Sequence, residues 1–87
     1  MQQRRKAAAL KYEGNFDSPV VTAVGMGQIA ENIIKKAEAG EVPIVYNKEL
    51  TDLLCNVDIG DSIPSELYEA VAQVIAYITD LDKLVER

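Results

Sequence analysis

An apolar stripe near the C-terminus constrains the fold of this 87-residue chain more than any other feature. Its spacing alternates between four and three residues, which is the period of one face of an α-helix. The pattern predicts a helix over about 64–84 that must pack against a core along one side. The stripe consists of Leu67, Val71, Val74, Ile78, Leu81 and Val85.

Three short runs before this helix predict β-strands. Residues 19–24 (PVVTAV) form a β-branched run, as is typical of a strand covered on both faces, and residues 42–46 (VPIVY) predict another short strand. Residues 6–12 (KAAALKY) predict a third, weaker strand, because alanine has low β-propensity. The sequence therefore predicts a small sheet of three strands.

Two further helices are expected between and after the strands. Residues 27–39 carry apolar side chains at helical spacing and end at Gly40, a suitable left-handed cap. Residues 48–55 follow Asn47, a good N-cap. The strand–helix–strand order predicts a right-handed parallel βαβ unit. The predicted class is α/β, with a small mixed sheet packed by three helices.

Charge is distributed unevenly along the chain. Residues 1–12 contain four basic and no acidic residues, and the remainder carries a net charge of −9. We expect residues 1–5 to form a flexible basic lead and residues 6–87 a single domain. The acidic body argues against a nucleic-acid partner, and no apolar run is long enough for membrane insertion. Residues 7–10 are too short for a secretory signal, so a cytoplasmic location is expected.

The sequence offers little catalytic chemistry. It contains no histidine, and its one cysteine, Cys55, is expected to be a buried or half-buried structural residue. The acidic residues of 58–69 match no calcium loop, and a tight turn accounts for residues 25–27 (GMG) better than a phosphate site does. We therefore expect no enzyme activity, no metal and no cofactor.

Four sequence segments identify a family resemblance, which composition alone does not. ALKY (9–12), SPVVTAVG (18–25), VPIVYN (42–47) and VDIGDSIPSELYEAVAQVIAYI (57–78) occur in this order with short gaps. Together they resemble the cytoplasmic C-terminal domain of the FlhB family, the export-switch proteins of flagellar and type III secretion. The block from Ile59 to Val74 is the most specific part of this resemblance.

The resemblance implies a self-cleavage motif that this sequence lacks. Family members cleave themselves within Asn-Pro-Thr-His, where the asparagine cyclises and the bond before proline breaks. The corresponding positions are Gln2, Gln3, Arg4 and Arg5. Without the asparagine and the Asn-Pro bond, the chain is not expected to cleave itself. It resembles the post-cleavage fragment as a separate, stand-alone protein.

The resemblance also implies partners and a binding patch. The partners would be export-gate proteins and export substrates, or the N-terminal cytoplasmic fragment of a full-length family member, at the cytoplasmic face of the export apparatus. The substrate-binding patch of the family falls on Ser18, Pro19, Ala72 and Ile75. An alternative for Ile75 is that it widens the core stripe.

Two questions stay open at this point. In the family, a further strand lies beside the one that matches residues 7–12. This sequence lacks that strand, which would leave an open sheet edge. We expect either that the charges of residues 4–6 protect the edge or that a strand of a partner pairs with it. The second open question is the function of the whole chain. The resemblance implies a non-enzymatic export module that substitutes for or modulates the switch protein. The alternative is that the same fold is reused as a cytoplasmic regulatory or ligand-binding module.

Overall fold

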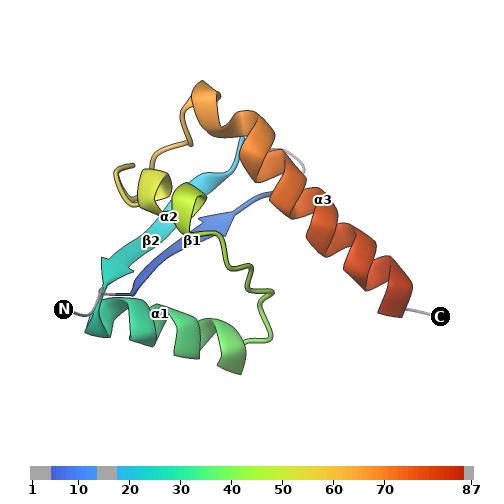
Figure 1. Cartoon of the computed structure of the whole chain (residues 1–87), viewed down its shortest axis with the longest axis horizontal. Coiled ribbons are helices and arrows are strands. Elements are labelled where there is room, and N and C mark those ends of the chain that lie inside the picture. Colours follow the sequence, from blue (N-terminus) through green and yellow to red (C-terminus); the bar gives the residue numbers. More distant parts are fainter. Residues whose placement is uncertain (1–4, 14–17, 86–87) are drawn as a thin grey trace.

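The structure, a computed structural model, describes residues 5–13 and 18–85, with side chains as far as Ile78. Two strands form a central hairpin, with α1 on one side and α2 and α3 on the other (Figure 1). In chain order the elements are β1 (Lys6–Lys11), β2 (Val20–Met26), α1 (Gln28–Ala39), α2 (Lys48–Leu54), a 3₁₀ turn η1 (Ser65–Leu67) and α3 (Tyr68–Val85). The three predicted helices are confirmed.

The two strands pair antiparallel with one irregularity. Ala9 lies opposite Ala23, but Leu10 lies opposite Val21, so Thr22 is an extra residue on β2. The Thr22 hydroxyl donates a 3.3 Å hydrogen bond to the carbonyl oxygen of Ala9. Because a bulge reverses the alternation of side chains, it allows Val21 and Val24 to face the same core although they are three residues apart.

The prediction of a third strand at 42–46 is wrong, and so is the parallel βαβ unit. Residues 42–47, here called the connector, have no strand partner within the described parts of the chain. Gly40 is not the left-handed cap, since it has φ −90° and Glu41 takes the positive φ of 59°. The amide of Val42 donates a 2.8 Å hydrogen bond to the carbonyl oxygen of Ala37 at the end of α1. The connector that follows does not pair with β1.

The outer edge of β2 is bonded to the loop before α3. The amide of Val21 donates to the carbonyl oxygen of Asp61 at 3.0 Å, and that of Gly60 donates to the carbonyl oxygen of Val21 at 2.7 Å. Gly60 has φ 95°, a conformation that glycine adopts without a steric penalty. This loop therefore covers part of one edge of the sheet.

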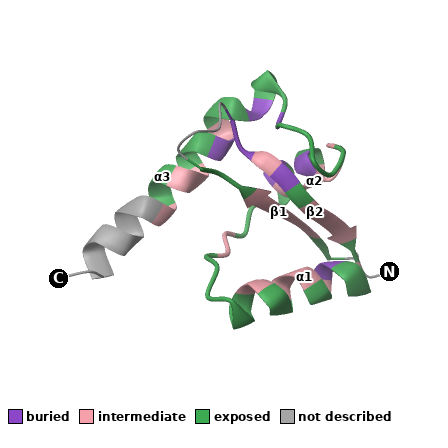
Figure 2. Ribbon diagram, turned by 180° about the vertical axis from the view of Figure 1, so that it is seen from behind, coloured by how far each residue is buried: buried purple, intermediate pink, exposed green. Residues whose placement is uncertain are grey.

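The core lies between β2, α2 and the first turns of α3 (Figure 2). The buried cluster confirms the start of the predicted stripe, and Val74 packs against it. The side chains of Leu81 and Val85 lie outside the described residues. The cluster consists of Val21, Leu50, Leu54, Ile63, Leu67 and Val71.

Candidate interaction surface

One opening in the molecule lies between β1 and the connector, and we call it the edge opening. Its volume is about 1320 Å³. Residues of α1 line one wall, namely Ile33, Ile34 and Ala37. Residues of α2 and α3 line the other, namely Leu50, Leu54, Val71, Val74 and Ile78. Both walls are apolar, which is typical of a surface that receives another hydrophobic group.

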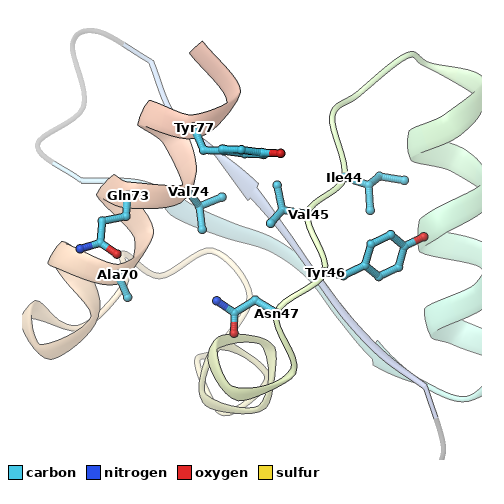
Figure 3. Close-up of a pocket in the computed structure, with 8 residues that line it drawn as sticks. All are labelled: Ile44, Val45, Tyr46, Asn47, Ala70, Gln73, Val74 and Tyr77. Atoms are coloured by element: carbon cyan, nitrogen blue, oxygen red, sulfur yellow. The ribbon is translucent and has the colours of Figure 1, made fainter. Parts of the chain in front are cut away.

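A smaller opening of about 500 Å³ lies between the connector and α3, and we call it the α3 opening. Figure 3 shows Val74 and Tyr77 of α3 facing Val45 of the connector, with the side chain of Tyr46 directed away from α3. Tyr46 is 78% exposed. Residues 44–47 of the connector line both openings and so form a common wall between them.

Five charged side chains line the edge opening, and three of them are joined by ion pairs. The carboxylate of Asp52 accepts the ammonium groups of Lys6 and Lys48, each at 3.1 Å. The hydrogen bond from Lys48, and then that from Lys6, hold the pKa of Asp52 below its ordinary value of 3.8. The carboxylate is therefore ionised throughout the neutral range and fixes the cationic end of β1 beside α2.

The four residues of the expected binding patch lie in different environments. Ser18 and Pro19 are buried, and the carbonyl oxygen of Pro19 accepts a hydrogen bond from the amide of Ile63 at 3.1 Å. Ala72 is exposed on α3, whereas Ile75 packs against the core and lines the edge opening. Of the four residues, Ala72 is thus the exposed one.

Three positions of the expected cleavage motif, Gln2, Gln3 and Arg4, lie outside the described residues. Arg5 is described. Its carbonyl oxygen accepts a 2.8 Å hydrogen bond from the amide of Gly27, and its guanidinium lies 3.7 Å from the carboxylate of Glu31. The last motif position is therefore paired with the junction between β2 and α1.

The remaining candidate groups have structural explanations. The Cys55 thiol is half-buried and donates to the carbonyl oxygen of Ala7 at 3.7 Å. Of the turn expected at residues 25–27, Gly25 and Met26 continue β2, and Gly27 with φ 65° alone joins β2 to α1. A side chain on Gly25 would collide with that of Ile29. Among the described residues, no three cysteine, aspartate or glutamate side chains are grouped to hold a metal. None of the helices described here combines the length and hydropathy needed to cross a membrane.

Sequence reasoning missed the connector as a surface. Its apolar run predicts a strand, but in the structure the segment pairs with no described strand, and Val42 is 55% exposed. The signal that separates the two outcomes is the number of strands available beside it, and that number depends on pairing between distant segments.

The chain is similar to known proteins along nearly its whole length. A family model described as "FlhB HrpN YscU SpaS Family" matches residues 4–78. The uncharacterized protein YlqH of Bacillus subtilis (strain 168) is 42% identical over 83 residues, which cover 94% of this chain and 89% of that protein. The flagellar biosynthetic protein FlhB of Aquifex aeolicus is 43% identical over 74 residues, which cover 83% of this chain and 21% of FlhB. The chain thus spans about a fifth of the length of the FlhB relatives that it matches.

Solved structures show the same fold. The cytoplasmic domain of FlhB from Shewanella putrefaciens superposes with a TM-score of 0.87 at 29% identity, over 93% of this chain and 68% of that one. The C-terminal domain of PscU superposes with a TM-score of 0.78 at 25% identity, over 84% of this chain and 95% of that one.

Proposed function

Because the chain belongs to the FlhB HrpN YscU SpaS family, we propose that it is a non-enzymatic interaction module of flagellar or type III protein export. In this role it substitutes for or modulates the corresponding domain of the full-length export-switch protein at the cytoplasmic face of the apparatus. Its partners are export-gate proteins, export substrates or a cytoplasmic fragment of the full-length protein.

The observation that carries this proposal is the pair of apolar openings on a fold shared with the export-switch domains. Apolar walls beside the connector support binding, whereas the described side chains include no group of three that could hold a metal ion. We therefore propose that the chain acts by binding to a partner protein.

We also propose that the chain does not process itself. The motif positions hold Gln2, Gln3, Arg4 and Arg5 in place of Asn-Pro-Thr-His. The test is intact-mass spectrometry of the purified chain during long incubation at neutral pH. A constant mass supports the proposal, and loss of a terminal fragment at these positions contradicts it.

Export substrates are proposed to meet the molecule near Ser18, Pro19, Ala72 and Ile75. Ala72 is the exposed member, so Ala72→Glu alters this surface with least damage to the fold. The matched control is Ala39→Glu at the exposed end of α1. Binding of a purified export substrate should weaken with Ala72→Glu and be unchanged with Ala39→Glu. Equal binding of the two variants would remove Ala72 from the site.

The decisive experiment for the function is co-purification from the cells that make the protein. A tagged full-length chain should bring down export-gate components, and deletion of its gene should alter motility or filament export. Normal export together with other, unrelated partners would instead favour the alternative hypothesis that the fold serves a regulatory or ligand-binding role.

A further inference from the structure

We infer that the α3 opening binds an uncharged, proline-rich segment of a partner protein in the polyproline II conformation. The segment lies between the connector and α3, and residues 44–47 separate it from the edge opening. The chemistry of the segment follows from the lining of the α3 opening. That the partner takes part in protein export rests on the proposed function.

The first observation is that no charged side chain lines the α3 opening. Its lining consists of Ile44, Val45, Tyr46, Asn47, Ala70, Gln73, Val74 and Tyr77. The chain as a whole is 26% charged, and five charged side chains line the edge opening. A charged guest in the α3 opening would lose hydration without gaining an ion pair, so the complementary segment is uncharged.

The second observation is the ring of Tyr77, which is 56% exposed. Figure 3 shows this ring edge-on, extending from α3 over the opening with one face turned towards Val45 and Val74. Both valines are half-buried and form an apolar floor. Aromatic side chains beside an apolar floor are typical of the grooves that bind proline-rich segments.

The third observation is the side-chain amide of Asn47. Its Oδ1 accepts the amide of Leu50 at 3.1 Å as the N-cap of α2, which leaves Nδ2 at the opening. Figure 3 shows the nitrogen on the side of Asn47 that faces α3. Nδ2 donates no hydrogen bond to any residue that the structure describes. Because an amide nitrogen only donates, the bound segment must present an acceptor.

These groups favour a polyproline II segment over a strand or a helix. A strand needs a ladder of backbone partners, and α3 offers none because its backbone groups are bonded within the helix. A polyproline II segment has no internal hydrogen bonds, so its carbonyl oxygens are available to Asn47. Proline lacks an N–H, so the segment leaves no backbone donor unpaired beside the apolar floor.

The test is an NMR titration of the full chain with two capped synthetic peptides. The probe is Ala-Pro-Leu-Pro-Pro-Leu-Pro-Ala, and the control peptide has alanine at each proline position. At concentrations up to about 1 mM, the probe should shift the side-chain amide of Asn47 and the backbone amides of Val45 and Tyr77. The control peptide should bind about tenfold more weakly or less. Equal binding of the two peptides, or no binding of the probe, would overturn the inference.

Two tyrosines of α3 provide a matched pair of variants. Tyr77 lines the α3 opening, whereas Tyr68 is 48% exposed and lines neither opening. Tyr77→Ala should weaken binding of the probe by about tenfold or more, because the contact with the aromatic ring is lost, and Tyr68→Ala should leave binding unchanged. Equal effects of the two variants would contradict the assigned position of the segment.

Asn47→Asp removes the donor while it preserves the cap. Aspartate caps a helix as well as asparagine does, so the first turn of α2 should keep its amide protection. Its carboxylate cannot donate a hydrogen bond and brings a charge to the opening. Binding of the probe should fall by about tenfold or more. An unchanged affinity would contradict both the role of Asn47 and the requirement for an uncharged site.

The outcomes separate the site from the proposed function, because the peptides contain no export component. Probe binding that depends on Tyr77 and Asn47 supports the site even where co-purification recovers no export-gate protein. Recovery of export-gate proteins without any binding of the probe contradicts the site and leaves the export role standing. Signals of Val45 and Tyr77 that shift with protein concentration in the absence of peptide assign the opening to a second copy and overturn the inference.

Discussion

The ammonium group of Lys6 in β1 lies 3.1 Å from Oδ1 of Asp52 in α2. The other carboxylate oxygen accepts Lys48 at the same distance, one helical turn away. A single aspartate therefore joins the start of the first strand to a helix more than forty residues later in the chain. Because all three side chains are partly exposed, this contact fixes position more than it adds stability.

The first prediction concerns the pKa of Asp52. Lys48→Met should raise the Asp52 pKa towards its ordinary value of 3.8, and Lys6→Met should raise it by less, because the hydrogen bond from Lys48 is the larger cause of the shift. The measurement is an NMR titration of the side-chain carboxyl carbon. A larger effect of Lys6→Met would reverse the assigned order of the two causes.

The same shift sets the sign of a pH effect on stability. The pKa of Asp52 is lower in the folded chain than in the unfolded one, so its contribution is complete above pH 3.8 and is lost as the pH falls through the folded value. Denaturation of the wild type and of the double variant Lys6→Met/Lys48→Met should therefore differ less at strongly acidic pH than at neutral pH. A difference that is independent of pH would contradict this account.

The second prediction concerns the contact between β2 and α1. A methyl group on Gly25 would collide with the side chain of Ile29 and lie 3.3 Å from the amide nitrogen of Ala30. Gly25→Ala should lower the free energy of unfolding by about 1–3 kcal/mol, as overpacking does. Gly40→Ala is the matched control, because its nearest contact is at 3.4 Å and its φ is −90°. Urea denaturation of the two variants measures the difference, and similar values would argue against close packing at Gly25.

The third prediction uses two adjacent leucines of α2. Leu54 is 4% exposed in the core cluster, whereas Leu53 is 49% exposed. Leu54→Ala should lower the free energy of unfolding by about 2–5 kcal/mol because it leaves a cavity, and Leu53→Ala should cost under about 1 kcal/mol. Thermal or urea unfolding tests the pair. Equal costs would place the core on a different face of α2.

The fourth prediction concerns the start of α2. The side-chain oxygen of Asn47 accepts the amide of Leu50 at 3.1 Å, which is the N-cap bond. Asn47→Ala should cost about 1 kcal/mol and should speed amide exchange in the first turn of α2. Asn56→Ala, in the exposed loop after α2, is the control and should have little effect. A larger cost for Asn56→Ala would show that the cap is not the stabilising contact.

The sequence predicts the helices well because their signals are local. The spacing from Leu67 to Val74 and the cap at Asn47 each act within a few residues, and both appear in the structure as expected. The sheet depends on distant pairing instead. Residues 42–46 have strong β-propensity, yet they pair with no described strand and form no strand themselves. The extra residue Thr22 leaves no sequence signal either, since its role follows from the register with Ala9.

The candidate surface is predictable only in part for the same reason. Helical spacing shows that Ala72 and Ile75 share one face of α3, offset from the main stripe. It does not show that Ser18 and Pro19 are buried, because that burial comes from the loop at Ile63, which bonds to Pro19. The edge opening is set by the separation of β1 from the connector, which no local pattern encodes.

The bonds between residues 60–63 and β2 also limit how the molecule can assemble. A sheet forms fibrils when every added chain offers a new template to the next, and this requires an accessible strand on both sides. Here the side of the sheet next to Val20 and Val21 is already occupied by the molecule's own loop. Association through the opposite side cannot continue along this covered edge, so complexes of this protein should not grow into longer assemblies as its concentration rises.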